Sequence, residues 1–260
     1  MKKNRWLIAL SAIAIHLSIG GAYAYSVYKN PIATELGWDA SQITIAFTIM
    51  MGLAGFAAAL FGGVVEKLGP RKAAMVAAVL FGLGQGGAGF AILSDSVVLY
   101  WLTYGLLSGV GMGIGYIAPV STLVKWFPNR RGLATGMAVL GFGAGALITA
   151  PVAANLMESV GIANTYFILG ISYFILMMAG ALYIAPPKPG EVEEMVVTVG
   201  GKKQELAQMT ARQAVKTKQF WMLWSMHLIN VTSGLMMISV ASPMAQEIAG
   251  LSVAAAATMV

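Results

Sequence analysis

The charged residues divide the chain into long apolar stretches. Charge-free stretches of 22 to 29 residues cover positions 6–28, 40–65, 73–94, 96–124, 132–157, 159–187 and 219–246. A helix rises 1.5 Å per residue, so about 20 residues cross a hydrocarbon core that is about 30 Å thick. Transmembrane β-strands would run for only about 10 residues and would alternate in polarity, which these stretches do not. The pattern therefore predicts seven transmembrane helices.

The composition of the chain agrees with this pattern. Hydrophobic residues make up 58% of the 260 residues, charged residues make up 10%, and the mean hydropathy is +0.77. A soluble protein carries about 25% charged residues, because its surface has to be covered with polar groups. We therefore expect an all-α integral membrane protein.

The basic residues predict how the helices are oriented. Fifteen of the sixteen lysines and arginines lie before the first stretch or in alternate loops, around residues 67–72, 125–131 and 188–218. The positive-inside rule places these segments in the cytoplasm, so we expect a multi-pass protein of the plasma or inner membrane with a cytoplasmic N-terminus. Because the basic residues form no single cluster with interleaved aromatics, binding of nucleic acid is not expected.

The chain is organised as six spans, a polar segment and a further span. Pro186 and Pro187 end the sixth span. We expect a six-helix bundle over 1–185, a cytoplasmic linker over 186–218 with a short helix near 205–216, and span seven with part of span eight over 219–260. This is the layout of a transporter with two six-helix halves. The apolar run that reaches Val260 is half the length of a span, so we expect an N-terminal fragment of a longer protein or a truncated gene.

Glycines recur at intervals of four in spans four and five. They lie at positions 105/109/113, 132/136 and 141/145. This spacing exposes backbone along one helix face and predicts close helix packing. An additional interpretation is that such smooth faces let helices move past one another.

The loop between spans two and three carries a motif. It reads Gly62-Gly63-Val64-Val65-Glu66-Lys67-Leu68-Gly69-Pro70-Arg71-Lys72. This resembles the signature loop of the major facilitator superfamily, with Glu66 in place of the usual Asp and Pro70 after the second glycine. The resemblance implies a latch between the two halves in the outward-open state, formed by Gly62, Glu66, Gly69, Arg71 and Lys72. The alternative is a tight basic turn with no role in gating.

Three further segments resemble the oxalate/formate antiporter family of that superfamily, which is related to the monocarboxylate transporters. The first is Tyr23-Ala24-Tyr25-Ser26-Val27-Tyr28-Lys29-Asn30-Pro31 with Gly37-Trp38. The second is Tyr116 followed by Lys125-Trp126-Phe127-Pro128-Asn129-Arg130-Arg131-Gly132-Leu133-Ala134-Thr135-Gly136, and the third is Gln219-Phe220-Trp221-Met222-Leu223-Trp224. The resemblance implies the twelve-helix fold of this superfamily and exchange of small organic anions by alternating access. It also implies an aromatic cage around the carboxylate.

The aromatic residues that match this cage are Tyr23, Tyr28 and Tyr116, with Tyr25 where members often have Trp and Phe142 where some have Tyr. At 100° per residue, Tyr23 points nearly opposite Tyr25, so all three span-one tyrosines share one cavity only if the helix breaks. Tyr28 lies beside Lys29 and fits a membrane-interface role equally well. No span contains a charged residue, so the countercharge for an anion would come from the second half.

His16 lies in the middle of span one on the face of Tyr23. It would either relay a proton or donate to substrate, or it would be a neutral histidine bonded across a helix interface. The chain has two histidines and no cysteine, and no span holds a carboxylate pair. We therefore expect no metal, no cofactor and no enzymatic activity.

These observations together predict a monomeric secondary transporter, an antiporter or proton symporter, whose partners are the lipid bilayer and a small organic anion such as oxalate, formate or another monocarboxylate. Within the same superfamily, the alternative is a carrier of a larger amphipathic acid or a neutral solute. From another class, the alternative is a membrane sensor or scaffold that does not transport.

Overall fold

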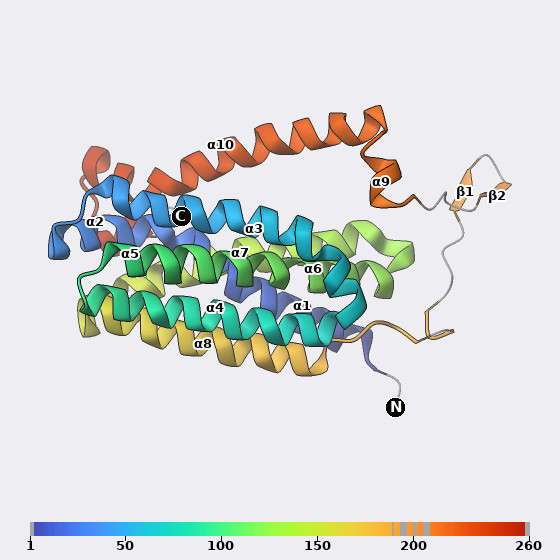
Figure 1. The fold of residues 1–260 in the computed structure, drawn as a ribbon, viewed down its shortest axis with the longest axis horizontal. Helices are drawn as coiled ribbons and strands as arrows, with labels where there is room; N and C mark the ends of the chain where they lie inside the picture. Colours follow the sequence, from blue (N-terminus) through green and yellow to red (C-terminus); the bar gives the residue numbers. More distant parts are fainter. Residues whose placement is uncertain (1–2, 189, 193–196, 200–201, 205–208, 258–260) are drawn as a thin grey trace.

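The computed structural model describes residues 3–188, 190–192, 197–199, 202–204 and 209–257. Seven of its helical segments are long and apolar enough to cross a membrane, which confirms the predicted number of spans (Figure 1). They are Arg5–Leu36, Ala40–Leu68, Pro70–Leu93, Val97–Trp126, Pro128–Val160, Ile162–Tyr183 and Lys218–Ala249.

The helices α3 (Ala40–Leu68), α4 (Pro70–Leu93) and α8 (Ile162–Tyr183) each form one span without interruption. The start of α3 is a capping box, in which the Asp39 side chain accepts from the backbone of Gln42 and the Gln42 side chain accepts from the Asp39 N–H. The turn between α3 and α4 is a single residue, Gly69, whose φ of +79° favours glycine, and Pro70 then begins α4.

The first span changes its winding midway. It consists of α1 (Arg5–Gly20), the 3₁₀ segment η1 (Gly21–Ala24) and α2 (Tyr25–Leu36). A 3₁₀ helix turns about 120° per residue, against 100° in an α-helix, so η1 rotates the side chains of α2 relative to those of α1. This break bears directly on where the tyrosines of span one point.

The fourth and fifth spans also contain short irregular pieces. Span four is formed by α5 (Val97–Tyr100), the π-helical segment η2 (Trp101–Leu107) and α6 (Ser108–Trp126). Span five is formed by the 3₁₀ turn η3 (Pro128–Arg130) and α7 (Arg131–Val160). Each span still continues as one rod through the bundle (Figure 1).

The glycines of span four bring it against α3. A Cβ added to Gly105, Gly109 or Gly113 would lie 2.4 to 3.1 Å from a backbone carbonyl oxygen of α3. Real Cβ atoms essentially never approach as closely as they would at Gly109 and Gly113, and the 3.1 Å contact at Gly105 would be tighter than most real Cβ contacts. The predicted close packing is confirmed for these three positions.

The glycine pairs of span five behave differently from one another. Gly145 faces α1, where an added Cβ would lie 2.4 Å from the carbonyl oxygen of Leu17, and Gly141 faces the same helix. At Gly132 and Gly136 an added Cβ would meet nothing within 4 Å. Among the described residues, no helix lies over that face of the first part of α7, so the packing prediction is wrong for this last pair there.

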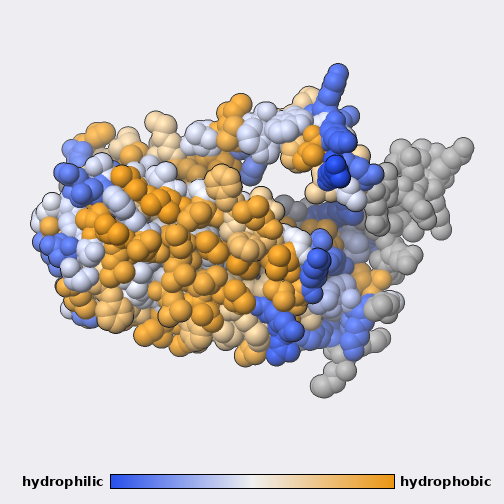
Figure 2. Space-filling view, in the orientation of Figure 1, coloured by the Kyte–Doolittle hydropathy of each residue, from blue (hydrophilic) through white to orange (hydrophobic). Residues whose placement is uncertain are grey.

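The outer surface of the bundle is apolar. Large side chains such as Phe56, Leu60 and Phe90 are more than 60% exposed. Figure 2 shows hydrophobic side chains over the middle of the bundle and hydrophilic ones gathered at its two ends. This is the surface expected of a protein whose middle lies in lipid, and the chain is a multi-pass membrane protein.

The segment after α8 differs in part from the prediction. It contains two short strands, β1 (Val197–Val199) and β2 (Lys202–Gln204), which pair antiparallel, so the chain has a small hairpin besides its helices. The predicted helix near 205–216 is reduced to α9 (Ala211–Ala214) among the described residues, and 205–208 lie outside them.

The seventh span, α10 (Lys218–Ala249), is followed by α11 (Val253–Ala257). It contacts α2 and η1 at one end of the bundle and diverges from the bundle toward α9 (Figure 1). An opening is visible between α10 and the bundle at the end where the N-terminus lies (Figure 2).

Candidate functional site

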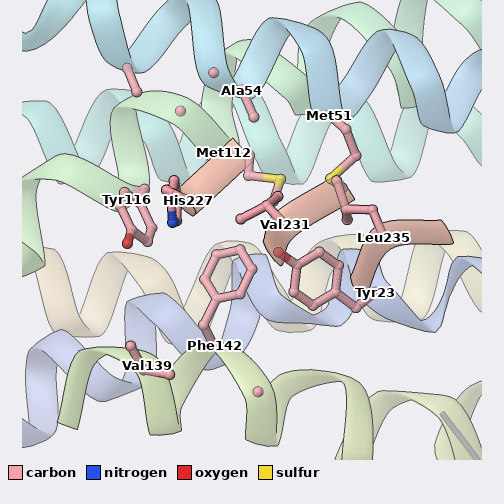
Figure 3. Close-up of a pocket in the computed structure, with 14 residues that line it drawn as sticks. Tyr23, Met51, Ala54, Met112, Tyr116, Val139, Phe142, His227, Val231 and Leu235 are labelled. Atoms are coloured by element: carbon pink, nitrogen blue, oxygen red, sulfur yellow. The ribbon is translucent and has the colours of Figure 1, made fainter. Parts of the chain in front are cut away.

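A cavity of about 500 Å³ lies between α10 and the bundle. Five spans line it: η1 of span one, α3, α6, α7 and α10. Most of the lining is apolar or small, including Met51, Ala54, Met112 and Val139. The polar side chains among the described lining residues are Tyr23, Tyr116 and His227 (Figure 3).

Three aromatic rings form one wall of this cavity. Phe142 lies between two tyrosines, with its ring centroid 4.9 Å from that of Tyr23 and 5.8 Å from that of Tyr116, both in edge-to-face geometry. Such pairs add about 0.5–1.5 kcal/mol each beyond the burial of their area. The phenol groups come from spans one and four, so donors from two helices reach the same space.

Close approach of α1 and α7 brings this wall together. A Cβ at Gly20 would lie 2.0 Å from the backbone carbonyl oxygen of Phe142. Since no side chain separates the two backbones here, Phe142 reaches past α1 toward Tyr23 and Tyr116. Gly20 therefore permits the close approach that brings Phe142 between the two tyrosines.

His16 lies directly behind this wall and is fully buried. Its Nδ1 is 2.9 Å from the carbonyl oxygen of Ala138 on α7, and its Nε2 is 3.2 Å from the carbonyl oxygen of Tyr116 on α6. The imidazole also stacks on the Tyr116 ring, with centroids 5.3 Å apart and planes 9° apart. These contacts agree with the interpretation of His16 as a histidine bonded across a helix interface. A role of His16 toward substrate stays a prediction.

Tyr25 and Tyr28 lie away from the cavity. Tyr25 is buried against α3, where it stacks on Phe47 and donates to the Thr44 hydroxyl at 2.9 Å. Tyr28 is 3% exposed and stacks on Tyr166 of α8 at 4.8 Å. The structure thus brings together Tyr23, Tyr116, Phe142 and His16. It places the other two expected substrate residues, which follow the 3₁₀ segment η1, in packing contacts with α3 and α8.

The loop expected to act as a latch is exposed at the end of the bundle that carries the N-terminus. Glu66, Arg71 and Lys72 all extend into open space. An added Cβ at Gly62 would meet nothing within 4 Å, so this glycine permits no helix contact within the described residues. Gly69 provides the tight turn that the motif predicts.

His227 is the lining residue that the sequence interpretation missed. It projects from α10 into the cavity, on the side opposite the bundle. The available signal was the same as for His16, a lone histidine within a charge-free span. Met51 and Met112, which look like ordinary apolar filler in the sequence, also line the cavity.

The tryptophan of the Lys125–Gly132 motif fastens the end of the sixth span. The Trp126 indole N–H donates to the carbonyl oxygen of Ala185 at 2.7 Å, and the ring is 4% exposed. The Lys3 ammonium group donates to the carbonyl oxygen of Tyr183, two residues before Ala185. The start of the linker is therefore held against both the N-terminus and span four.

Comparison with known proteins identifies the family. The family model of the Major Facilitator Superfamily matches residues 10–260. The chain belongs to this superfamily. A similar fold is found in the solved structure of a bacterial homologue of the human lysosomal transporter Spinster, with a TM-score of 0.69 and 15% sequence identity. The match covers 99% of the present chain and 59% of the Spinster homologue.

Two bacterial relatives match most of this chain. It is 30% identical over 262 residues to the uncharacterized MFS-type transporter YhjX of Escherichia coli, covering 100% of this chain and 62% of that protein. It is 29% identical over 244 residues to the oxalate:formate antiporter of Oxalobacter formigenes, covering 92% and 55%. The chain thus spans about three fifths of the length of these relatives.

A human relative extends this similarity. The chain is 30% identical over 187 residues to human monocarboxylate transporter 11, covering 72% of this chain and 39% of that protein. The resemblance to the oxalate/formate antiporter family and its monocarboxylate relatives is confirmed by these matches.

Proposed function

We propose that the protein is a secondary carrier that moves small organic anions across the cell membrane by alternating access. The observation that carries this proposal is the cavity between α10 and the first six spans, with the Tyr23 and Tyr116 side chains on the bundle side and His227 on the other. Residues 1–185 form the first bundle, 186–218 the cytoplasmic linker, and 219–260 begin the second bundle.

The chemistry of the cavity supports a carboxylate as the substrate. Phenol and imidazole N–H groups donate hydrogen bonds, and bonds to a charged acceptor are stronger than neutral ones. The described lining contains no Asp or Glu that would repel an anion and no Lys or Arg that would neutralise it. The countercharge therefore has to come from groups outside this lining.

The apolar part of the lining supports a carboxylate with an apolar body rather than a compact dianion. Met51, Ala54, Met112 and Val139 present hydrocarbon and thioether surface to the cavity. In a compact dianion, the carboxylate that does not reach the tyrosine and histidine donors would lose hydration against these apolar side chains without gaining hydrogen bonds. Among small organic anions, monocarboxylates with a short hydrocarbon part fit this surface best.

The charge distribution supports the orientation. Basic residues dominate the end of the bundle with the N-terminus and the linker, so this end faces the cytoplasm of a plasma or inner membrane. The opening beside α10 lies at the same end, so the described conformation gives access from the cytoplasm. For the opposite conformation, we propose that the loop with Gly62, Glu66, Gly69, Arg71 and Lys72 latches the two bundles together. The carrier acts as a monomer and needs no cofactor.

Exchange in proteoliposomes tests the proposal. Vesicles loaded with a monocarboxylate such as pyruvate should take up external labelled pyruvate in a saturable manner. Formate should compete, and the compact dianion oxalate should compete more weakly. A neutral sugar and a bulky amphipathic acid are tested in parallel. Uptake inhibited by the sugar but by no carboxylate would contradict the proposal and favour a neutral solute. The absence of any uptake would favour a sensor or scaffold.

A further inference from the structure

The two ring nitrogens of His16 face the same kind of partner. Nδ1 faces the carbonyl oxygen of Ala138 and Nε2 faces that of Tyr116, at 2.9 and 3.2 Å. A carbonyl oxygen accepts hydrogen bonds and cannot donate one. A neutral imidazole carries one N–H, so it satisfies only one of these contacts, whereas the imidazolium ion donates to both.

The shorter distance favours the neutral tautomer that carries its proton on Nδ1. Nδ1–H donates to Ala138, and the lone pair of Nε2 then points at the Tyr116 carbonyl oxygen. Two electron-rich atoms that face each other repel. Nε2 is therefore the atom that gains most from a proton, because protonation turns this repulsive contact into a hydrogen bond between α1 and α6.

Among the described residues, none around His16 provides a fixed countercharge. Tyr116 is the titratable group that faces it from α6, and Tyr23 and His227 face the cavity beyond. Its neighbours on α7 are Gly141 and Phe142, which do not titrate. The charged residues of α1, α6 and α7 lie near the helix ends, at Arg5, Lys125, Arg131 and Glu158.

The cost of a buried charge therefore favours the neutral form while the cavity is empty. An anion in the cavity changes this balance. The Tyr116 and Phe142 rings both line the cavity, and both contact the imidazole, at centroid distances of 5.3 and 6.1 Å. Only one layer of aromatic rings then separates the two charges, and a low-dielectric environment strengthens their attraction.

We propose that His16 binds a coupling proton, which it takes up on Nε2 when a carboxylate enters the cavity and releases when the carboxylate leaves. This inference rests on the proposed carboxylate transport. The proton comes from water on the side to which the cavity is open, and the Nε2 lone pair forms the new N–H bond, which donates to the Tyr116 carbonyl oxygen. On the other side the proton returns to water, so one carboxylate and one proton cross together.

Reciprocal coupling follows from this scheme. If the anion favours the proton, the proton must favour the anion by the same factor. For a single linked proton, the apparent affinity for the carboxylate should rise by about tenfold per unit decrease in pH, over the range in which His16 changes its state. If carboxylates exchange while the proton stays bound to His16, the rate of exchange should depend much less on pH.

The transport test compares two variants. In proteoliposomes with an internal pH-sensitive dye, wild-type protein should acidify the lumen as pyruvate enters, and its apparent KM should fall as the external pH is lowered. His16→Gln keeps an amide donor for the two carbonyls but cannot take a proton. It should still exchange pyruvate but lose the acidification and the pH slope of KM. The comparison variant His227→Gln removes the other histidine of the chain. Because His227 lines the cavity, its KM for pyruvate should rise at every pH, but the acidification and the pH slope of KM should persist. An unchanged slope and acidification in His16→Gln would overturn the proposal.

A second measurement separates this inference from the proposed function. In His227→Gln the chain holds a single histidine, so ¹⁵N-histidine NMR of that variant in lipid nanodiscs reports His16 alone. One nitrogen should be bare and one protonated at alkaline pH, and adding pyruvate near neutral pH should convert the bare nitrogen into an N–H. A bare nitrogen that persists at saturating pyruvate would overturn the coupling role while exchange continues. Absence of both exchange and any pyruvate effect on the spectrum would instead overturn the proposed function along with the inference.

Discussion

Gly20 packs directly against the backbone of Phe142, with no side chain between the two helices. An added Cβ would lie 2.0 Å from the Phe142 carbonyl oxygen and 2.8 Å from its carbonyl carbon. Backbone atoms yield far less readily than the end of a flexible side chain. This contact holds α1 and α7 together beside the aromatic wall of the cavity.

Gly20→Ala should therefore destabilise the protein. Overpacking of this kind costs about 1–3 kcal/mol or more, which corresponds to a loss of several degrees in Tm. Thermal unfolding followed by fluorescence-detected size exclusion measures the change. Gly136→Ala is the matched control, because its added methyl meets open space and alanine favours a helix more than glycine does, so its Tm should not fall below that of the wild type. Equal Tm values for the two variants would contradict the packing described for Gly20.

The tyrosine hydroxyls should differ in their effect on transport. Tyr23→Phe and Tyr116→Phe each remove a donor from the cavity wall, and a hydrogen bond to a charged group contributes about 1.5–3 kcal/mol. The KM for pyruvate should rise by at least about tenfold in each. Tyr25→Phe loses only its bond to Thr44 and should leave KM within about twofold while lowering the Tm slightly. A larger KM effect from Tyr25→Phe than from the other two would show that the wrong tyrosines line the path.

The charge pattern explains why the spans were predictable and the site was only partly so. A charge at the centre of a helix costs about 2.5–3.5 kcal/mol on insertion, so charge-free stretches mark the spans reliably. Which face of a span meets the cavity depends instead on rotation and packing. The 3₁₀ segment η1 separates the direction of Tyr23 from those of Tyr25 and Tyr28, and residue spacing alone shows only that the three cannot face together.

The same reasoning explains His227. The sequence shows that a histidine lies inside the seventh span. The direction of its side chain depends on the packing of α10 against α2, which the lengths and positions of the spans do not reveal. The contacts of His16 with two carbonyl oxygens likewise depend on the close approach of α1, α6 and α7. The short hairpin of β1 and β2 was not predicted, although Val197-Thr198-Val199 alternates in polarity and two glycines follow it in the sequence.

Topology can be tested without first removing native thiols, because the chain contains no cysteine. Lys72→Cys should react with a membrane-impermeant maleimide only after intact cells are permeabilised. Glu35→Cys lies at the opposite end of the bundle and should react in intact cells. Both positions are exposed, so differences in burial do not explain a difference in labelling. Labelling of Lys72→Cys from outside would contradict the cytoplasmic orientation.

The indole of Trp126 should hold the end of span six in place. Trp126→Phe removes the N–H that donates to Ala185 while keeping an aromatic ring, and the expected loss is about 1 kcal/mol of local stability. Hydrogen–deuterium exchange of the backbone amides around Ile184 and Ala185 should become several-fold faster. Trp6→Phe is a suitable control, since the Trp6 ring packs on Phe127 without bonding the end of span six. Unchanged exchange in Trp126→Phe would show that the contact does not hold the linker.

Protection of a cavity thiol by substrate is the most direct test of whether a carboxylate occupies this cavity. Val139→Cys places a thiol in the lining, and Lys72→Cys places one in the exposed loop outside it. The rates of modification by a small maleimide are compared in purified protein with and without saturating pyruvate. We expect pyruvate to slow the reaction at position 139 by at least about tenfold, as expected when an occupied site excludes the reagent, and to leave position 72 unchanged. Equal rates at position 139 with and without pyruvate, in protein that exchanges pyruvate, would contradict the assignment of this cavity as the transport site.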